Sequence, residues 1–232
     1  FGSRIRVLAK EGARLSLVTV NLLDKSVKCF NGIGSEVLDN ALVEVTQVEL
    51  GGSSVFSGFR QNLSGYASKS LGHQVYMACK NQSLDINYIS NQLGRQTESS
   101  ITSDGIVDEG GQKVWRGTID FKKGCVDSKG DEQENVLLLG DDTEEGEGKL
   151  VNKSLPVILC DEEAVEGRHG CSIGRLSPEI LFYMQSRGLD ENAARKMLVR
   201  AKINSVCRFI PDSELVGRIQ DFASFNSYTD AE

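Results

Sequence analysis

Apolar and polar residues alternate with a period of two through much of the first three quarters of the chain. The alternation is strict from Val43 to Leu50, and it recurs from Leu84 to Ile89 and from Trp115 to Phe121. A period of two places one set of side chains on one face of a strand, so these stretches predict strands with one buried face. The run from Val136 to Leu139 is apolar throughout and predicts a short strand buried on both faces.

A weak internal repeat relates two of these stretches. The segment from Ala41 to Gly51 resembles the segment from Gln82 to Gly94, about 42 residues later, and each ends in Leu-Gly before a Ser/Thr-rich run. A recurrence of this length fits two coils of about 20 residues each in a β-solenoid, where every coil buries its face on its neighbours. An antiparallel sandwich would show the same periodicity, so the pattern alone leaves both architectures open.

Helical signals replace the alternation after Arg175. Ser177 is a capping residue, Pro178 suits the first helical position, and Glu179 places an acid in the first turn. This helix is expected to end at Gly188, a common C′ residue. We therefore predict a strand-rich core over residues 1–174 and a C-terminal helical subdomain over residues 175–232.

Two further helices are predicted in that subdomain. One is capped by Asp190-Glu191, and the other is opened by Pro211-Asp212. The apolar face expected for the first consists of Ala194, Met197, Leu198 and Ala201, and that of the second consists of Leu215, Ile219 and Phe222.

Composition narrows the classes of partner and compartment. The chain has 33 acidic and 26 basic residues and a net charge of −7, which disfavours nucleic acid and anionic membranes as partners. No apolar run approaches the roughly 18 residues of a membrane span, and no secretory signal is seen. The six cysteines are scattered without a CxxC pair, which predicts reduced thiols in a cytoplasmic protein.

Candidate chemistry is sparse. In an extended segment His169 and Cys171 share a face, and an imidazole with a thiolate there suits a soft metal, with Glu163 and Glu166 as further oxygen ligands. The alternative is a hydrogen-bonded histidine beside a small core cysteine. An acidic loop over residues 140–148 resembles a solvated surface loop more than a calcium loop, because it lacks the calcium-loop order of ligands. No nucleophile and base can be paired, so hydrolytic catalysis is not expected.

The stretch RHGCSIGRLSPEILFYMQSRG, residues 168–188, resembles the SufB/SufD family of iron–sulfur cluster assembly. The resemblance rests on His169-Gly170, on Leu181-Phe182-Tyr183 and on Ser186-Arg187-Gly188. Asn135 with the following leucines and Trp115-Arg116-Gly117 also match family words. It is specific over residues 115–201.

The resemblance implies a right-handed parallel β-helix followed by a helical subdomain. It also implies a non-catalytic subunit that pairs through its β-helix with a SufB-like subunit or with a second copy of itself. An ABC-type ATPase, SufC, would dock on the helices, and a transient iron–sulfur cluster would lie at the subunit interface. The competing interpretations are a β-helical polysaccharide lyase or hydrolase and an interaction module without cluster ligands.

Site residues carry over one by one. His169 matches the SufD histidine at the SufB–SufD interface, whereas Gly170 stands where SufB has a functional glutamate. The position of the SufB scaffold cysteine falls near Glu134, so the chain resembles SufD more than SufB. A ligand role for Cys171 is our own hypothesis, because this cysteine is not part of the family pattern. We expect exposed Gln185, Arg187 and Arg195 in the SufC-docking surface and Phe182 in the core.

Overall fold

A computed structural model describes residues 1–140 and 149–226, so the expected acidic loop, apart from Gly140, lies outside the described residues. Its strands are β1 (Gly2–Ala9), β2 (Arg14–Asn21), β3 (Lys28–Val37), β4 (Leu42–Glu49), β5 (Ser54–Leu63), β6 (Lys69–Ala78), β7 (Ser83–Gln92), β8 (Glu98–Val107), β9 (Gln112–Phe121), β10 (Ser128–Leu138), β11 (Val151–Cys160) and β12 (Val165–Arg175). Its helices are α1 (Pro178–Ser186), α2 (Glu191–Cys207) and α3 (Ser213–Asn226).

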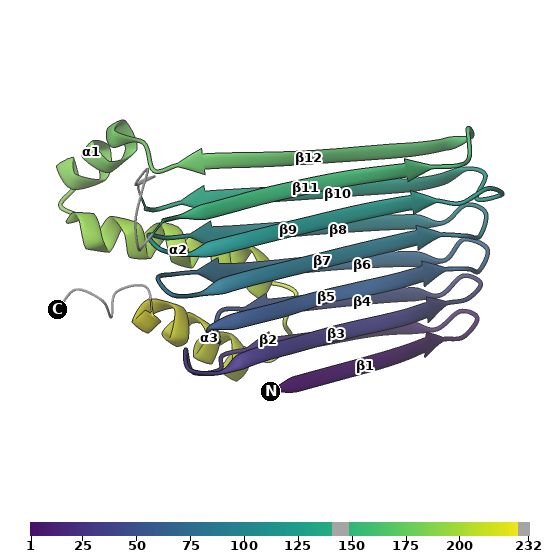
Figure 1. Cartoon of the computed structure of the whole chain (residues 1–232), viewed down its shortest axis with the longest axis horizontal. Helices are drawn as coiled ribbons and strands as arrows, with labels where there is room; N and C mark the ends of the chain where they lie inside the picture. The colour runs from purple at the N-terminus through teal and green to yellow at the C-terminus, as the bar shows by residue number, and fades with distance from the viewer. Residues whose placement is uncertain (141–148, 227–232) are drawn as a thin grey trace.

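The strands wind into a right-handed parallel β-solenoid (Figure 1). Odd-numbered strands form one six-stranded sheet in the order β1-β3-β5-β7-β9-β11, and even-numbered strands form a second six-stranded sheet. Successive strands lie in opposite sheets, so each pair of strands makes one coil. The expected β-solenoid is confirmed and the antiparallel sandwich is excluded, because the neighbouring strands of both sheets pair in parallel.

The coil is longer than the internal repeat indicated. Leu42 pairs with Lys69, and Lys69 pairs with Glu98, so one coil holds about 28 residues. The expected coil of about 20 residues is therefore wrong. The two similar segments belong to β4 and β7, which lie in opposite sheets, so the repeat spans about one and a half coils. The repeat therefore relates two strands from opposite sheets that line the same interior. It does not relate strands at equivalent positions of successive coils.

The space between the two sheets holds the main core. Trp115, Tyr76 and Tyr88 are fully buried there, and the ring of Tyr88 stacks on Phe59 with centroids 4.2 Å apart. The indole of Trp115 donates a hydrogen bond to Ser103 at 3.0 Å, which satisfies its one polar group.

The helices begin where the capping signals predicted. Ser177 accepts a hydrogen bond from the backbone N–H of Ile180 at 3.2 Å, and Asp190 accepts one from Ala193 at 2.7 Å. Asp212 does the same for Leu215 at 3.1 Å at the start of α3. None of the helices in the described parts of the chain is long and apolar enough to cross a membrane.

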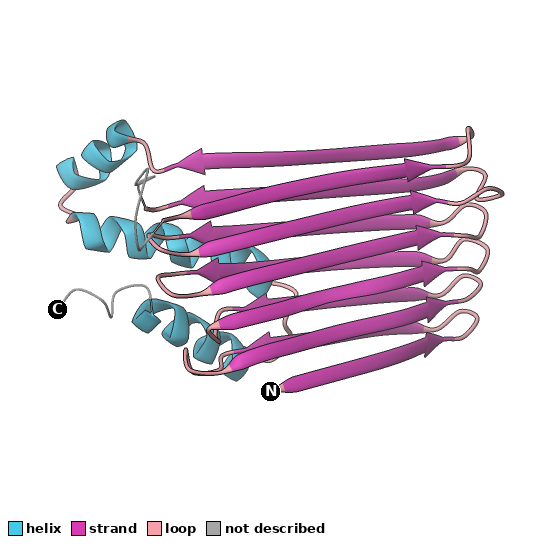
Figure 2. Cartoon of the chain, viewed as in Figure 1, coloured by secondary structure: helices cyan, strands magenta, loops and turns pink. Residues whose placement is uncertain are grey.

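Helices α2 and α3 pack against the outer face of the even-numbered sheet, near the C-terminal ends of its strands (Figure 2). The predicted stripe of α3 is confirmed, with Ile219 buried at its centre. The predicted stripe of α2 is partly wrong, because Met197 is 51% exposed and Ala201 is exposed. The face that α2 buries consists of Ala194, Val199, Ile203, Val206 and Cys207. This face packs against Val75, Met77 and Ile106 of the sheet. The helix has two overlapping apolar stripes, and contact with the sheet determines which of them is buried.

Polar contacts fasten α2 to the solenoid. The ammonium of Lys202 lies 2.9 Å from Asp104 on β8 and donates to the carbonyl of Asn135 at 3.1 Å. Arg195 donates to the carbonyl of Leu139 at 2.5 Å and pairs with Glu191 at 2.9 Å. The expectation that Arg195 is exposed is therefore wrong, since its side chain is 27% exposed and binds within the chain.

Candidate functional site at the last coil

Strand β12 is the last strand of the even-numbered sheet and pairs with β10 on one edge only, within the part of the chain that the structure describes. The register places His169 beside Glu132 and Cys171 beside Glu134. Both carboxylates point into the solenoid and are fully buried. His169 and Cys171 therefore share the inward face of β12, as their spacing predicted, at the coil that closes the described solenoid.

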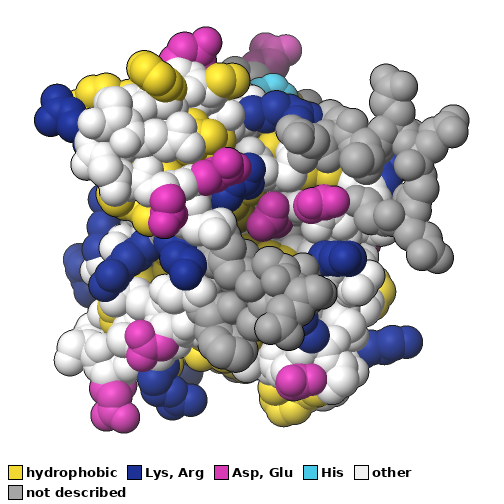
Figure 3. Space-filling view, turned by 90° about the vertical axis from the view of Figure 1, so that its left-hand side faces the viewer, with side chains coloured by type: hydrophobic (Ala, Val, Ile, Leu, Met, Phe, Trp, Pro, Cys, Tyr) yellow, Lys and Arg dark blue, Asp and Glu magenta, His cyan; other side chains and the backbone are white. Residues whose placement is uncertain are grey.

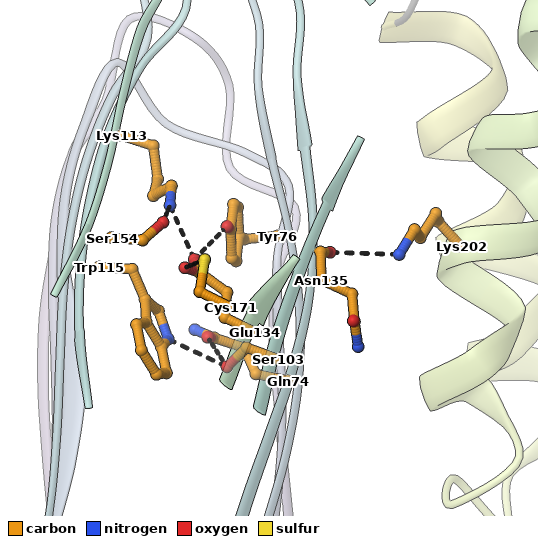
Figure 4. A network of polar contacts seen from close by, with 10 residues as sticks. All are labelled: Gln74, Tyr76, Ser103, Lys113, Trp115, Glu134, Asn135, Ser154, Cys171 and Lys202. Carbon is orange, nitrogen blue, oxygen red and sulfur yellow. Dashed lines mark hydrogen bonds and ion pairs between the residues drawn. The ribbon is translucent and has the colours of Figure 1, made fainter. Parts of the chain in front are cut away.

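Glu134 is the centre of a buried polar network (Figure 4). Its Oε1 atom accepts hydrogen bonds from Lys113 at 2.7 Å and from the Tyr76 hydroxyl at 2.6 Å. Lys113 also donates to Ser154 on β11 at 2.9 Å, and neither Lys113 nor Glu134 has an exposed side chain. The other carboxylate oxygen, Oε2, lies 3.5 Å from the Sγ atom of Cys171. Burial lowers the pKa of Lys113, and the Glu134 carboxylate partly opposes that shift.

Glu132 precedes Glu134 by two residues on β10, and its carboxylate has fewer hydrogen-bond partners. Its Oε1 atom accepts a hydrogen bond from the backbone N–H of Val157 at 2.8 Å and lies 3.9 Å from Nδ1 of His169. Its Oε2 atom is buried without a hydrogen-bond partner among the described residues. Burial raises the pKa of Glu132 to about 7, because the charged form loses its water without gaining a cation in contact. This carboxyl group therefore titrates near neutral pH.

The donors at the surface of this coil are His169, whose side chain is 47% exposed, and Cys171. Partial burial and the nearby Glu134 raise the pKa of the Cys171 thiol, so the thiol form dominates at neutral pH. A soft metal would have to displace that proton to gain a thiolate ligand. The pair offers one nitrogen and one sulfur donor, which is fewer than the four of a closed metal site.

The predicted oxygen ligands do not join this pair. Glu166 lies on the opposite face of β12 from His169 and forms an ion pair with Lys129 at 3.0 Å. Glu163 lies in the turn before β12. Among the residues that the structure describes, no group of three or more His, Cys, Asp or Glu side chains could hold a metal ion. A ligand role for Glu163 and Glu166 is therefore not supported.

A second candidate surface lies on α1. Gln185 and Arg187 are exposed as expected, and the guanidinium of Arg187 lies 5.2 Å from the centroid of the Tyr183 ring. The expectation that Phe182 packs in the core is wrong, because its side chain is 72% exposed. Ile180, Phe182 and Tyr183 of α1 are all exposed, and we call these three residues the apolar patch of α1. Ile180 and Tyr183 lie one turn apart on one side of the helix, and Phe182 follows around the helix from Tyr183. Hydrophobic side chains gather at the top of the helical end of the molecule, where α1 lies (Figure 3).

Sequence reasoning missed that three charged residues are buried behind the site, although it had noted the position of Glu134. Lys113, Glu132 and Glu134 lie in polar stretches that resemble solvent-exposed strand faces. A signal was present, since Glu132 and Glu134 continue the same alternate positions as Val136 and Leu138, which are buried. When acidic and large apolar residues occupy the same alternate positions of a strand, they share one face. The acidic residues can be predicted as buried only if the apolar ones are known to face inward.

Comparisons with known proteins point to one family. The family model of the SUF system FeS cluster assembly SufBD core domain matches residues 2–202. The chain is 24% identical over 119 residues to the iron–sulfur cluster assembly protein SufD of Bacillus subtilis, which covers 51% of this chain and 26% of the relative. It is 23% identical over 217 residues to SufB of the same organism, covering 89% and 43%. An iron–sulfur cluster assembly SufBD family protein of Mycobacterium tuberculosis is 25% identical over 218 residues, covering 89% and 24%. The chain spans less than half the length of these relatives.

Proposed function

The chain belongs to the SufB/SufD family of the SUF iron–sulfur cluster assembly system, and we propose that it acts there as a non-catalytic, SufD-like partner subunit. In this role it works in the cytoplasm and pairs through its solenoid with a SufB-like subunit or with a second copy of itself. The nascent cluster is the cargo of the complex. ATP hydrolysis belongs to a SufC-type ABC ATPase that docks on the C-terminal helices.

The observation that carries the pairing proposal is the exposed edge of β12 with His169 and Cys171 on its inward face. An edge strand presents a row of backbone N–H and C=O groups that can pair with a strand of another subunit. Each subunit then contributes its own donors at the junction. Two donors from this chain and two from its partner would make the four that iron in a sulfur-rich site takes.

The SufD-like assignment is supported by the residue that this chain has near the position of the SufB scaffold cysteine. Glu134 stands there, is fully buried, and is committed to Lys113 and Tyr76. A carboxylate with these contacts is held in place and cannot move out to accept and release cargo. The chain therefore supplies a partner surface to a cluster that a different subunit builds.

The SufC-docking proposal rests on the apolar patch of α1. Ile180, Phe182 and Tyr183 are more than half exposed, and three exposed large apolar side chains on one short helix offer apolar surface for a partner to cover. Gln185 and Arg187 supply polar contacts beside the patch, and we keep both in the docking surface. Arg195 contributes by holding α2 against the segment that follows β10 rather than by contacting the partner directly.

The pairing proposal is tested by co-purifying this chain with a SufB-like subunit and a SufC-type ATPase, followed by native mass spectrometry. His169→Ala and Cys171→Ser are compared with Ser172→Ala, a neighbour on the opposite face of β12. After anaerobic loading with iron and sulfide, we expect His169→Ala to lower the cluster absorbance while leaving the mass of the complex unchanged. If Cys171→Ser loads like the wild type, the ligand role of Cys171 is wrong. A complex that lacks any second SufB/SufD subunit would overturn the pairing proposal.

The docking proposal needs a separate test. Phe182→Ser on α1 is compared with Tyr66→Ser, which removes another half-exposed aromatic ring from a turn of the solenoid. We expect Phe182→Ser to weaken binding of the ATPase by at least tenfold, because it removes an exposed aromatic anchor. Equal binding by the two variants would move the docking surface away from α1.

A further inference from the structure

A groove crosses the outer face of the odd-numbered sheet over β1, β3, β5 and β7. Its volume is about 540 Å³. Its floor includes three glycines, Gly32, Gly34 and Gly58, and Gly32 pairs with Gly58 in register. The Phe30 ring leans over Gly32, whereas no atom lies within 4 Å of where a Cβ at Gly34 would stand. A space of this size suits a small ligand. The groove lies over the first coils, so it is independent of the last-coil site and of the function proposed for it.

One wall of the groove is aromatic. Phe30 and Phe56 are register partners on β3 and β5, and their side chains are 57% and 52% exposed. Two neighbouring exposed phenylalanines are costly to leave in water, and each offers a ring face on which a planar group can stack.

The other side of the groove is cationic. Arg6 on β1 and Arg60 on β5 are the register partners of Gly34, one on each side of it. Arg4 on β1 is the register partner of Gly32. No ion pair or side-chain hydrogen bond holds these three guanidinium groups among the described residues. In a chain with a net charge of −7, three such arginines together are a local exception.

The carboxylates of this face are already occupied. Asp85 binds Arg116 through two contacts, one of them at 2.5 Å. Glu36 accepts hydrogen bonds from Asn62 at 3.0 Å and from Ser64. The arginines of the groove therefore have no free carboxylate beside them on this face, and their complement is an external anion.

The distance between the phenylalanines and the arginines limits the size of the ligand that can contact both. Phe30 and Gly34 are four residues apart on one strand, so the aromatic row and the Arg6–Arg60 row are separated by about 13 Å between Cα atoms. After the side chains are added, one planar ring fits beside the phenylalanines, but an α-helix of about 10 Å diameter does not. Guanidinium groups bind phosphate oxygens through paired N–H donors, which makes phosphate the anion that this wall fits best.

We propose that this groove, defined by Phe30, Phe56, Arg4, Arg6 and Arg60 over the glycine floor, binds a small molecule in which a planar ring is joined to a phosphate group. The ring lies against the phenylalanines and the phosphate lies between the arginines. The arginines alone would bind any anion, and the phenylalanines alone would bind any planar ring. Selectivity for a ligand that carries both groups therefore requires both parts of the groove.

The test titrates the chain, labelled with ¹⁵N at glycine, with phenyl phosphate, AMP, adenosine and inorganic phosphate. The amide signals of Gly32, Gly34 and Gly58 report binding at the groove itself. We expect phenyl phosphate or AMP to shift these signals at millimolar concentration. Adenosine and inorganic phosphate should bind at least about tenfold more weakly, because each offers only one of the two groups.

Three variants locate the site. Arg60→Gln and Phe56→Ala should each weaken binding by about tenfold, the loss expected for one charged or one stacking contact. Gly34→Leu should abolish binding by filling the groove, and the fold tolerates it because a Cβ at Gly34 meets no atom within 4 Å. Gly217→Leu on α3, where a Cβ also meets nothing, is the matched control and should bind normally.

The proposal is overturned if neither phenyl phosphate nor AMP shifts the groove signals. It is also overturned if Gly34→Leu binds like the wild type, because the ligand then sits elsewhere. Equal affinity for inorganic phosphate and for phenyl phosphate would reduce the groove to a surface anion site and would remove the role of the phenylalanines.

Discussion

The Sγ atom of Cys171 lies 3.5 Å from Oε2 of Glu134, its register partner on the neighbouring strand. The contact joins the exposed end of the solenoid to a buried network, because the same carboxylate binds Lys113 and Tyr76 in the interior. A change at the buried end should therefore be measurable at the exposed thiol.

The first prediction concerns the reactivity of Cys171. Burial, followed by the charge of Glu134, raises the pKa of this thiol. Glu134→Gln removes the negative charge, so the pH midpoint for alkylation of Cys171 by iodoacetamide should fall. The rate is followed peptide by peptide with mass spectrometry, since Cys160 is also exposed. Glu166→Gln, on the outer face of β12, is the control, and an equal shift in that variant would contradict the contact.

The second prediction concerns the buried ion pair. Lys113→Met leaves the Glu134 carboxylate without its cation in a site with no exposed surface. Loss of one partner of a buried pair costs about 3 to 5 kcal/mol, so the free energy of unfolding in urea should fall by that order. The double variant Lys113→Met/Glu134→Leu should recover most of the loss, because no charge then remains buried. A double variant as unstable as the single one would show that the damage comes from packing.

The third prediction is a pH dependence that arises from Glu132. Its folded-state pKa of about 7 lies above the unfolded value of 4.5, so the folded chain holds a proton that the unfolded chain has lost. The free energy of unfolding should therefore fall as the pH rises from about 4.5 to about 7, by roughly 3 kcal/mol at most. Glu132→Gln keeps the size of the side chain and cannot ionise.

Urea unfolding at several pH values checks this expectation. His169 lies 3.9 Å from Glu132, the charge of Asp131 also acts on it, and both groups remain in the variant. The difference between the wild type and Glu132→Gln thus isolates the one carboxyl group. Parallel curves for the two proteins across this range would mean that Glu132 is solvated.

The fourth prediction concerns the contact between the solenoid and the segment after α2. The ring of His73 on β6 stacks on Phe209 with centroids 3.6 Å apart, and its Nε2 atom lies 3.2 Å from Glu44 without hydrogen-bond geometry. Burial lowers the pKa of His73, although Glu44 opposes the shift, and Arg208 adds to it.

The unfolded chain then binds the proton more tightly than the folded chain, so stability should be lost as the pH falls below the ordinary histidine value of 6.5. His73→Phe keeps the stack on Phe209 and removes the contribution of this imidazole, so the stability of the wild type should fall relative to that of the variant between pH 7 and about 5. Glu44→Gln should deepen the loss, because it removes the group that favours the charged ring. Parallel curves for the wild type and His73→Phe across this range would contradict the assignment.

Local patterns carried the prediction of individual elements. The alternation from Val43 to Leu50 became β4, and the caps at Ser177 and Asp190 start their helices as expected. These features depend on residues within one turn or one strand, so the sequence around them is sufficient. The coil length, in contrast, depends on which strands pair. The repeat at about 42 residues predicted the wrong coil length, because strands of both sheets bury similar apolar side chains in the same interior.

The sequence by itself determined the strand-rich core, the three helices, the shared face of His169 and Cys171, and the resemblance to the SufB/SufD family, which the family model confirms. Only the tertiary structure decided that Glu132 and Glu134 are buried behind that face, that α2 turns Val199 rather than Met197 to the sheet, and that Phe182 is exposed. The physical reason is that burial belongs to a residue and its non-local neighbours together. A polar side chain on an alternating strand is buried or solvated according to the register of the next coil.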